Sequence, residues 1–357
     1  MKTSINLIVA RILATAAKRK ASDVHLIAGS PPILRIDNKL SELKEEEIIT
    51  KEFIAEFAGF ILNAKQKEVL EKERELSVVF VFEGKVRMKI NLYYQKGTLV
   101  MSLKLISLRI PAITELGLPK SLEQVVEAER GLIFICGPFG AGRTTTAAAL
   151  IEEINKKRGE NIITIEKPIE YIFTNNKSII LQREVGRDVN SFADALAYCK
   201  QEDVDIILIG ENNEKETAGL IVDLVTAGRL IFYIVNSAST TQTIENFLAQ
   251  FAPAAQHSVR QFLAESLVAI ISQRLVPQIG GGRALALEIL TNTLAVKSLI
   301  RDGKIYQLQS IVQTSRHEGM ISLDQSLADL VKRGIVTEEE AAGEAVDKHN
   351  FYELINS

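Results

Sequence analysis

The spacing of apolar and polar residues changes character near residue 107 and divides the chain into two predicted parts. Before that point, short alternating runs lie between amphipathic segments, which predicts a small α+β domain over residues 1–106. After it, short apolar runs alternate with helical patterns, which is typical of a parallel α/β domain. Residues 107–114 contain Pro111 and are predicted to form a linker between the parts.

The first part is expected to begin with a helix that ends near Lys20. Turn-forming residues at Gly29–Pro32 and at Asp37-Asn38-Lys39 separate the apolar runs that follow. The alternating runs predict strands over residues 23–26, 33–36, 77–82, 87–94 and 99–106, and helical spacing predicts helices over residues 50–62 and 64–73.

The second part is expected to contain an α/β core over residues 115–290 and a mostly helical region over residues 291–357. A glycine turn at Gly280–Gly282 precedes the last predicted strand. The expected strands are 132–136, 162–166, 179–182, 205–209, 230–235 and 284–289, with helices between most of them.

A glycine-containing loop, Gly137–Thr145, follows the first strand of this core and leads into an alanine-rich helix. Gly137 and Gly142 are separated by four residues, as in a phosphate-binding P-loop. Glycines allow backbone N–H groups to close around an anion, and the helix presents its positive end to that anion. The residues expected to surround nucleotide phosphates are Gly137, Pro138, Gly140, Gly142, Arg143, Thr144 and Thr145.

One position of this loop departs from the P-loop pattern. The pattern has lysine after the second glycine, and this chain has Arg143. Lysine places a compact ammonium between phosphates, whereas arginine is larger, planar and forked. We therefore expect binding to survive and the alignment of the transition state to suffer. Thr144 stands where a hydroxyl would ligate Mg²⁺.

Acidic residues at two strand ends are candidates to complete the site. Glu211 follows the apolar run at 205–209, and a carboxylate at the end of a neighbouring parallel strand can hold the Mg²⁺ shell. Glu166 ends the strand at 162–166, where a carboxylate can polarise an attacking water. An ordinary acidic transition from strand to loop is the alternative interpretation of Glu166 and its neighbour Glu170.

Composition excludes several other functions. The net charge of −3, the absence of tryptophan and the lack of a basic stripe argue against a motor that acts directly on DNA or RNA. Cys136 and Cys199 are too far apart in the sequence for a CxxC zinc site, and the histidines lack metal-ligand spacing. No Gly-x-Ser-x-Gly elbow is present for a serine hydrolase.

The apolar residues after Lys2 form a helical pattern rather than a leader. Arg11 interrupts them, Lys18-Arg19-Lys20 follows, and no small-residue cleavage site closes the segment. No window of the sequence is long and apolar enough to span a bilayer. A soluble cytoplasmic protein without a transmembrane segment is therefore expected.

The motifs together resemble those of the type IV pilus retraction ATPases (PilT-like), within the larger family of secretion and pilus-assembly ATPases. The resemblance extends over almost the whole chain. It rests on residues 21–26, 31–32, 35, 137–145, 164–170, 182–186, 205–211, 265–267, 280–283 and 295–302. The last segment is similar to the C-terminal signature of the retraction branch, and the lack of four clustered cysteines also favours that branch.

This resemblance implies a RecA-like ATPase core preceded by a PAS-like domain. It implies a homohexameric ring with ATP and Mg²⁺ bound between subunits, where Arg87 and Lys104 serve a neighbour's nucleotide. Glu166 and Glu211 would carry the catalysis, and Thr144 and Glu211 would hold the metal. The implied partner is an inner-membrane pilus platform protein, which would place the chain at the inner face of the cytoplasmic membrane.

Several positions other than Arg143 depart from the family pattern. Lys167 replaces an acid beside Glu166. The other departures are Lys89, Lys104, the segments 201–205 and 212–214, Arg229 and Asn236. Losing one well-placed electrostatic stabiliser costs about 2.7–4 kcal/mol, or about 10²–10³ in rate, so slow hydrolysis is expected.

Two alternatives to slow hydrolysis stay open at this point. In the first, Lys167 or Arg229 acts as a replacement cation at the phosphates and restores the rate. In the second, the chain is a non-catalytic paralogue that serves as a regulatory or structural subunit, in a mixed ring with an active paralogue.

Overall fold

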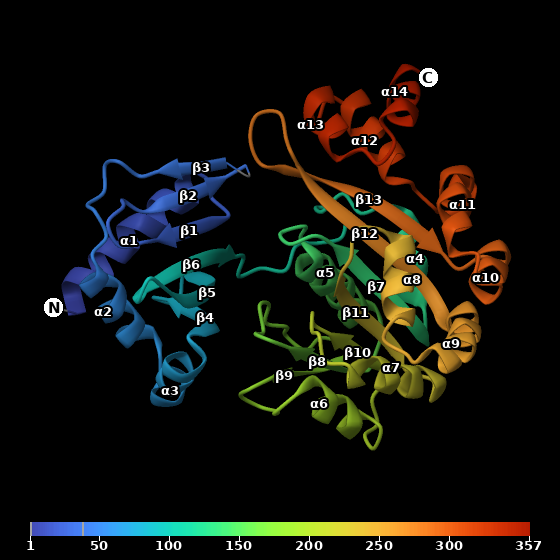
Figure 1. Ribbon diagram of the computed structural model, residues 1–357, viewed down its shortest axis with the longest axis horizontal. Helices are drawn as coiled ribbons and strands as arrows, with labels where there is room; N and C mark the ends of the chain where they lie inside the picture. Colours follow the sequence, from blue (N-terminus) through green and yellow to red (C-terminus); the bar gives the residue numbers. More distant parts are fainter. Residues whose placement is uncertain (1, 38) are drawn as a thin grey trace. The chain divides into compact units, whose positions relative to one another are not determined.

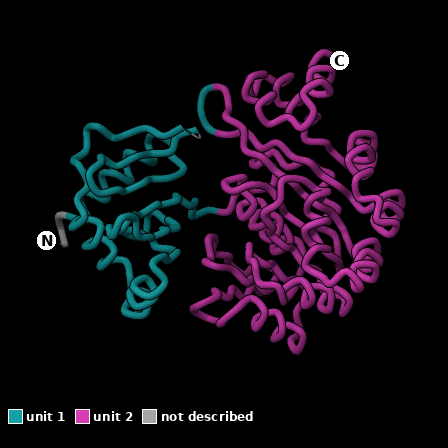
Figure 2. The backbone as a smooth tube through the Cα atoms, in the orientation of Figure 1, with its two compact units in different colours: residues 1–109, 280–282 teal, residues 110–279, 283–357 magenta. Residues whose placement is uncertain are grey.

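The computed structural model describes residues 2–37 and 39–357. The chain forms two compact units, one of residues up to 109 with residues 280–282, and one of residues 110–279 with residues 283–357 (Figure 2). The turn predicted at Asp37-Asn38-Lys39 includes Asn38, which lies outside the described residues. The linker at 107–114 and the division after residue 290 stay predictions.

The first unit is built on an antiparallel sheet with the strand order β3-β2-β1-β6-β5-β4 (Figure 1). Its strands are β1 (Asp23–Leu26), β2 (Ile33–Ile36), β3 (Lys39–Glu42), β4 (Glu75–Phe82), β5 (Val86–Gln95) and β6 (Thr98–Ile106). Its helices are α1 (Lys2–Lys18), α2 (Lys51–Ile61) and α3 (Ala64–Glu73). Strand β3 was not predicted, because its side chains are mostly exposed and show no apolar alternation.

The second unit is built on a mostly parallel sheet with the strand order β13-β12-β7-β11-β10-β8-β9. Neighbouring strands from β12 to β9 are parallel, and β13 pairs antiparallel with β12. The strands are β7 (Gly131–Gly137), β8 (Asn161–Glu166), β9 (Ile179–Glu184), β10 (Ile206–Ile209), β11 (Leu230–Asn236), β12 (Leu267–Pro277) and β13 (Arg283–Thr291). The expected α/β class with a parallel-rich sheet is confirmed.

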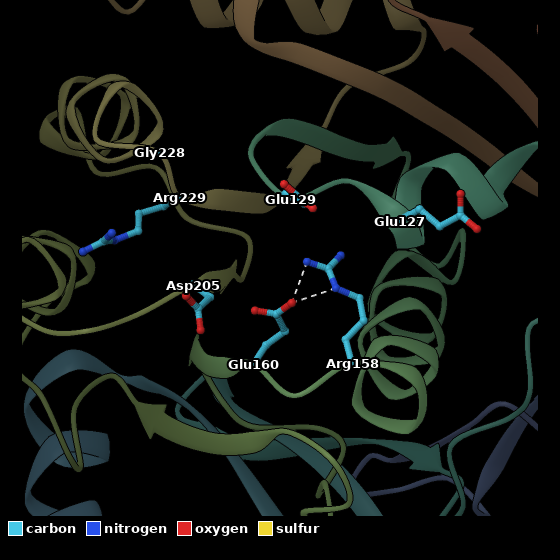
Figure 3. Close-up of a pocket in the computed structure, with 7 residues that line it drawn as sticks. All are labelled: Glu127, Glu129, Arg158, Glu160, Asp205, Gly228 and Arg229. Atoms are coloured by element: carbon cyan, nitrogen blue, oxygen red, sulfur yellow. Dashed lines mark hydrogen bonds and ion pairs between the residues drawn. The ribbon is translucent and has the colours of Figure 1, made fainter.

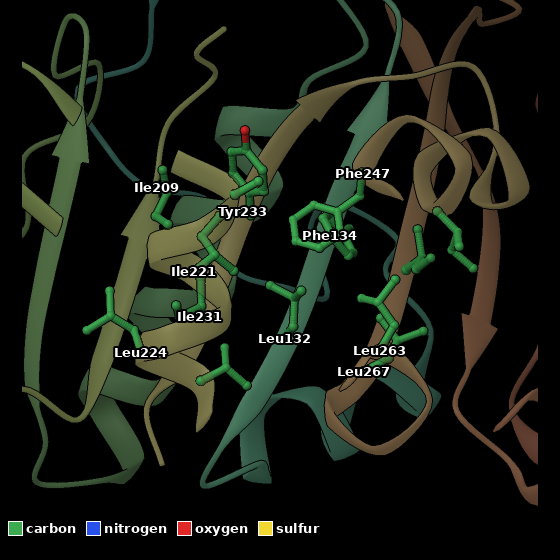
Figure 4. Packing of buried hydrophobic residues seen from close by; sticks show 14 of the residues in the cluster. Leu132, Phe134, Ile209, Ile221, Leu224, Ile231, Tyr233, Phe247, Leu263 and Leu267 are labelled. Carbon is green, nitrogen blue, oxygen red and sulfur yellow. The ribbon is translucent and has the colours of Figure 1, made fainter. Parts of the chain in front are cut away.

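Both faces of this sheet are covered, as the nearly continuous apolar runs of its central strands β7, β10 and β11 require. Leu132 and Phe134 of β7 pack into a core on one face (Figure 4). Ile133 and Ile135 pack into a core on the other face. Helix α5 (Arg143–Lys157) covers the second face together with α4 (Glu123–Glu127). The first face is covered by α6 (Phe192–Cys199), α7 (Glu216–Thr226), α8 (Thr240–Leu248) and α9 (Pro253–Ser266).

Strand β12 lies beside β7 and was not predicted from the sequence. Helix α9 ends at Ser266 and β12 begins at Leu267, so no turn residues mark the boundary. The apolar run of β12 is also interrupted by polar residues at Ser272–Arg274. Only pairing with β7 and β13 identifies this segment as a strand.

The chain ends in a series of short helices that pack partly on the hairpin of β12 and β13. These helices are α10 (Leu294–Arg301), α11 (Leu308–Thr314), α12 (Leu323–Lys332), α13 (Glu338–Glu344) and α14 (Lys348–Asn356). Within residues 2–37 and 39–357, no helix has the length and apolar character needed to cross a membrane.

Candidate functional site

The loop after β7 has the backbone of a phosphate cradle. Gly137, Gly140 and Gly142 adopt positive φ values of 150°, 80° and 86°. A Cβ at Gly137 would lie 2.5 Å from the carbonyl oxygen of Gln273, so a larger residue does not fit. Gly142 is the N-cap of α5, and the helix follows at once with Arg143. The residues present therefore fit phosphate groups at the positive end of α5.

The Arg143 side chain is buried and points to neighbouring strand ends. Its Nη1 donates to the carbonyl oxygen of Val235 at 2.6 Å, and its Nη2 donates to Glu211 Oε2 at 2.7 Å. The side chain is only 7% exposed, whereas that of Glu211 is 42% exposed. The forked guanidinium thus joins the P-loop to the ends of β11 and β10, and it neutralises the carboxylate expected to serve Mg²⁺.

The threonines of the loop differ in their surroundings. Thr145 Oγ1 lies 2.9 Å from the hydroxyl of Tyr171, and burial raises the pKa of that tyrosine. Thr144 lies in the first turn of α5 and is partly exposed. The sequence did not identify Tyr171 as a neighbour of the loop, since the contact spans 26 residues. Thr144 has the position expected of a metal-ligating hydroxyl, and that role stays a prediction.

Glu166 is a buried carboxyl group at the end of β8. Its side chain accepts a hydrogen bond from Thr164 Oγ1 at 2.8 Å. Burial raises the pKa of Glu166 to about 7, since the charged form loses its hydration. Glu170 raises it further, whereas the hydrogen bond from Thr164 lowers it. A carboxyl group with this pKa can exchange a proton near neutral pH.

The strand register brings these groups to one edge of the sheet. Ile165 of β8 pairs with Ile209 of β10, so Glu166 at the end of β8 and Glu211 just after β10 lie at neighbouring strand ends. Gly137 pairs with Asn236 at the end of β11, which lies between β7 and β10. Because carboxyl ends of parallel strands share an edge, the loop and both carboxylates lie on the same side of the sheet.

The alternative in which Arg229 acts as a replacement cation at the phosphates is contradicted by its place in the sheet. Arg229 precedes β11, whose first residue pairs with Gly131 at the start of β7. The length of β11 puts it about 20 Å from the P-loop edge. Its Nη2 donates to the carbonyl oxygen of Glu202 at 3.1 Å. The altered segment 201–205 also precedes β10, so these departures do not converge on the phosphate loop.

Arg229 instead lines a charged cavity of about 450 Å³ at the amino edge of the sheet (Figure 3). The cavity is lined by Glu127, Glu129, Arg158, Glu160, Asp205, Gly228 and Arg229. Figure 3 shows the Arg158 guanidinium facing Glu160, while the Arg229 side chain extends away from them. Within the described part of the chain, no cluster of His, Cys, Asp or Glu is arranged to hold a metal ion.

The remaining candidate residues lie in the first unit. Arg87 is on β5 opposite Ile106, and Lys104 is on β6 opposite Lys89. The P-loop belongs to the second unit. Contact of Arg87 and Lys104 with a nucleotide therefore stays a prediction. Lys167, the other possible replacement cation, is exposed beside Glu166.

The chain matches the model of the type II/IV secretion system protein family over residues 2–281. It belongs to this family. The type IV pilus retraction ATPase PilT of Pseudomonas aeruginosa is 35% identical over 96% of this chain and 99% of its own length. A twitching motility protein of Neisseria gonorrhoeae is 32% identical over 95% of this chain and 91% of its own length.

A solved structure of the same kind resembles the chain throughout. The crystal structure of the pilus retraction motor PilT with bound ADP superposes with a TM-score of 0.82. It is 36% identical and covers 96% of this chain and 98% of its own. The resemblance to PilT-like pilus ATPases and the RecA-like core that it implied are confirmed.

Proposed function

We propose that this protein is a PilT-like motor ATPase that couples ATP hydrolysis to pilus retraction. The observation that carries the proposal is the placement of a P-loop and two strand-end carboxylates at one edge of a RecA-like sheet, in a member of this family. The ADP bound in the PilT relative supports nucleotide as the ligand.

The residues of the site have distinct proposed roles. The loop backbone from Gly137 to Thr145 surrounds the phosphates, and Arg143 supplies a positive charge to them. Thr144 and Glu211 hold Mg²⁺, which neutralises developing negative charge on the phosphates when bound. Glu166 orients the attacking water and accepts its proton, a role that suits a carboxyl group with a pKa of about 7.

Hydrolysis is proposed to be slow. Arg143 donates hydrogen bonds to Val235 and Glu211. These bonds must break before Arg143 can contact the nucleotide and Glu211 can hold the metal. Lys167 is the remaining candidate for a compensating cation, since Arg229 lies at the other edge.

The proposed assembly is a homohexameric ring or a mixed ring with a paralogue. In it, Arg87 and Lys104 of one subunit approach the nucleotide of the next. A pilus platform protein of the inner membrane is the proposed partner, and the chain would act at the cytoplasmic face of that membrane. Co-purification of the full chain with a platform protein tests this placement.

The experiment for hydrolysis compares the purified full chain with Glu166→Gln. Phosphate release is measured with ATP and Mg²⁺, and ATP binding is measured by calorimetry. The proposal expects turnover above background in the wild type and background turnover in the variant, with binding retained in both. Wild-type turnover at background level, unchanged by Glu166→Gln, would contradict the proposed hydrolysis.

A second candidate function is a regulatory subunit that binds nucleotide without useful turnover. The ion pair between Arg143 and Glu211 favours it, because the P-loop cation and the proposed metal ligand neutralise each other. This candidate expects ATP affinity that is insensitive to chelation of Mg²⁺, with no turnover by the chain alone. Robust turnover by the isolated protein rules it out.

A further inference from the structure

Gln273 of β12 lies directly beside the start of the phosphate loop. Strand β12 is parallel to β7, with Ser272 paired to Cys136. The next residue, Gln273, is therefore level with Gly137, where β7 ends. The two come into close contact, since a Cβ at Gly137 would lie 2.5 Å from the Gln273 carbonyl oxygen and 3.4 Å from its Cγ.

The side chain of Gln273 is a polar interruption in an apolar face. Side chains alternate along a strand, so Ala269, Ile271 and Gln273 point to the same face of the sheet. Ala269 and Ile271 pack in the core beneath α5. Gln273 comes next, where α5 gives way to the loop, and it is only 1% exposed. A buried carboxamide at this position calls for a polar partner.

That partner is the loop itself. Gln273 Nε2 donates to the carbonyl oxygen of Ala141 at 2.6 Å. A Cβ at Gly142 would lie 3.3 Å from the same Nε2. The carboxamide thus bonds to Ala141 and leaves little room for a side chain at Gly142 on the β12 side. The Oε1 atom of Gln273 is buried without a hydrogen-bond partner among the described residues. The hydrogen bond to Ala141 is therefore made by the donor Nε2.

Peptide geometry links this bond to the phosphate side of the loop. The carbonyl of Ala141 and the N–H of Gly142 belong to one planar trans peptide, so they point in opposite directions. Holding the carbonyl toward β12 therefore turns the Gly142 N–H away from β12. Backbone N–H groups that face outward are the donors with which a P-loop binds phosphate.

We propose that Gln273 is a positioning residue for the phosphate loop, which orients the Gly142 N–H toward bound phosphate by holding the Ala141 carbonyl. The inference rests on the proposed nucleotide binding. Gln273 acts through the loop backbone and has no contact with the reacting atoms. Its loss is expected to weaken nucleotide binding more than it weakens the fold.

The experiment titrates ADP and ATP into the full chain by calorimetry and records thermal unfolding of the same samples. Gln273→Met keeps the side-chain length and removes the donor, and about tenfold weaker binding is expected. Gln273→Glu keeps the shape of the side chain but, when ionised, repels the Ala141 carbonyl. Nucleotide binding weaker than that of Gln273→Met is therefore expected. If Gln273→Met does not fold, Gln273→Asn keeps the carboxamide but falls short of Ala141, and it carries the same test.

Asn292 offers a matched control near the other end of β12. Its Nδ2 donates to the carbonyl oxygens of Ala264 and Leu267 at 3.0 and 2.7 Å, and its Oδ1 is likewise buried without a partner among the described residues. Asn292→Leu is expected to lower the melting temperature with nucleotide affinity unchanged.

The outcomes separate the two levels of inference. A wild type that binds neither nucleotide contradicts the proposed function. A wild type that binds, with Gln273→Met binding equally well, overturns the positioning role. The positioning role is also overturned if Gln273→Met and Asn292→Leu both lose nucleotide affinity in proportion to the fall in their melting temperatures. A general loss of stability would then explain both losses of affinity.

Discussion

The two edges of the central sheet both gather charged residues, but in opposite arrangements. At the carboxyl edge, Arg143 is buried and joins a glycine loop to Glu211. At the amino edge, Arg158 pairs with Glu160 and donates to the carbonyl oxygens of Val126 and Ala128 at 2.9 and 2.7 Å. Arg143 lies where strand ends and the N-terminus of a helix converge. Arg158 instead holds together the segments that connect helices and strands.

This difference explains why the charged cavity did not guide the choice of the proposed nucleotide site. The cavity of about 450 Å³ lies at the amino edge, away from the loop. Strand direction is the better guide, because parallel strands place their following loops at the carboxyl edge. Arg229 illustrates the point, since its strand starts at the edge opposite the P-loop.

The largest effect is expected for Glu166→Gln at the carboxyl edge. Turnover of ATP should fall by about 10²–10⁴, because the amide cannot accept the proton of the attacking water. Phosphate release by the full chain measures this. Glu160→Gln, at the amino edge, is the matched control and should leave turnover unchanged. Equal losses in both variants would remove the functional distinction between the edges.

Arg143→Lys is expected to raise turnover by about 10–100-fold, since a lysine restores a compact charge between the phosphates. It also frees Glu211 from the forked guanidinium. Steady-state ATP hydrolysis is the measurement. Arg229→Lys makes the same exchange at the other edge and should change nothing. A gain from Arg229→Lys would show that the amino edge takes part in the chemistry.

Arg158→Ala is expected to lower the free energy of unfolding by about 1.5 kcal/mol, because it leaves partly buried carbonyl groups without their donor. Urea denaturation measures the change. Nucleotide affinity should stay the same, since the lost bonds are to Val126, Ala128 and Glu160. The exposed neighbour Arg130 supplies the control variant Arg130→Ala. A loss of affinity without loss of stability would assign the amino edge a binding role.

The last comparison concerns the pH dependence of stability. Folding raises the pKa of Glu166 from 4.5 to about 7, so the folded protein holds a proton that the unfolded chain releases between these values. Stability should therefore fall as pH rises through this window. Glu166→Gln removes that contribution. Melting temperatures at about pH 5 and about pH 8 should differ more in the wild type than in the variant. Equal changes of melting temperature with pH in the wild type and the variant would contradict a raised pKa of Glu166.

Much of the fold was predictable because the central strands of the second unit are largely apolar and many of the turns between elements carry glycine or proline. The strand that includes Leu132–Cys136 and the helix that begins at Arg143 follow from that pattern. Strand β12 did not, since it follows α9 without a turn and contains Ser272–Arg274. Its polar residues are explained by their partners in the folded chain, as Gln273 shows.

The sequence by itself determined the family, the phosphate loop and the identity of its unusual cation. These depend on short segments in which neighbouring residues act together, so spacing alone reveals them. Only the tertiary structure decided which charges share an edge. It placed Glu166 and Glu211 at the same edge of the sheet as the loop and Arg229 at the opposite edge, and it paired Arg143 with Glu211. Strand order and register bring distant segments together, and no local pattern of residues encodes that pairing.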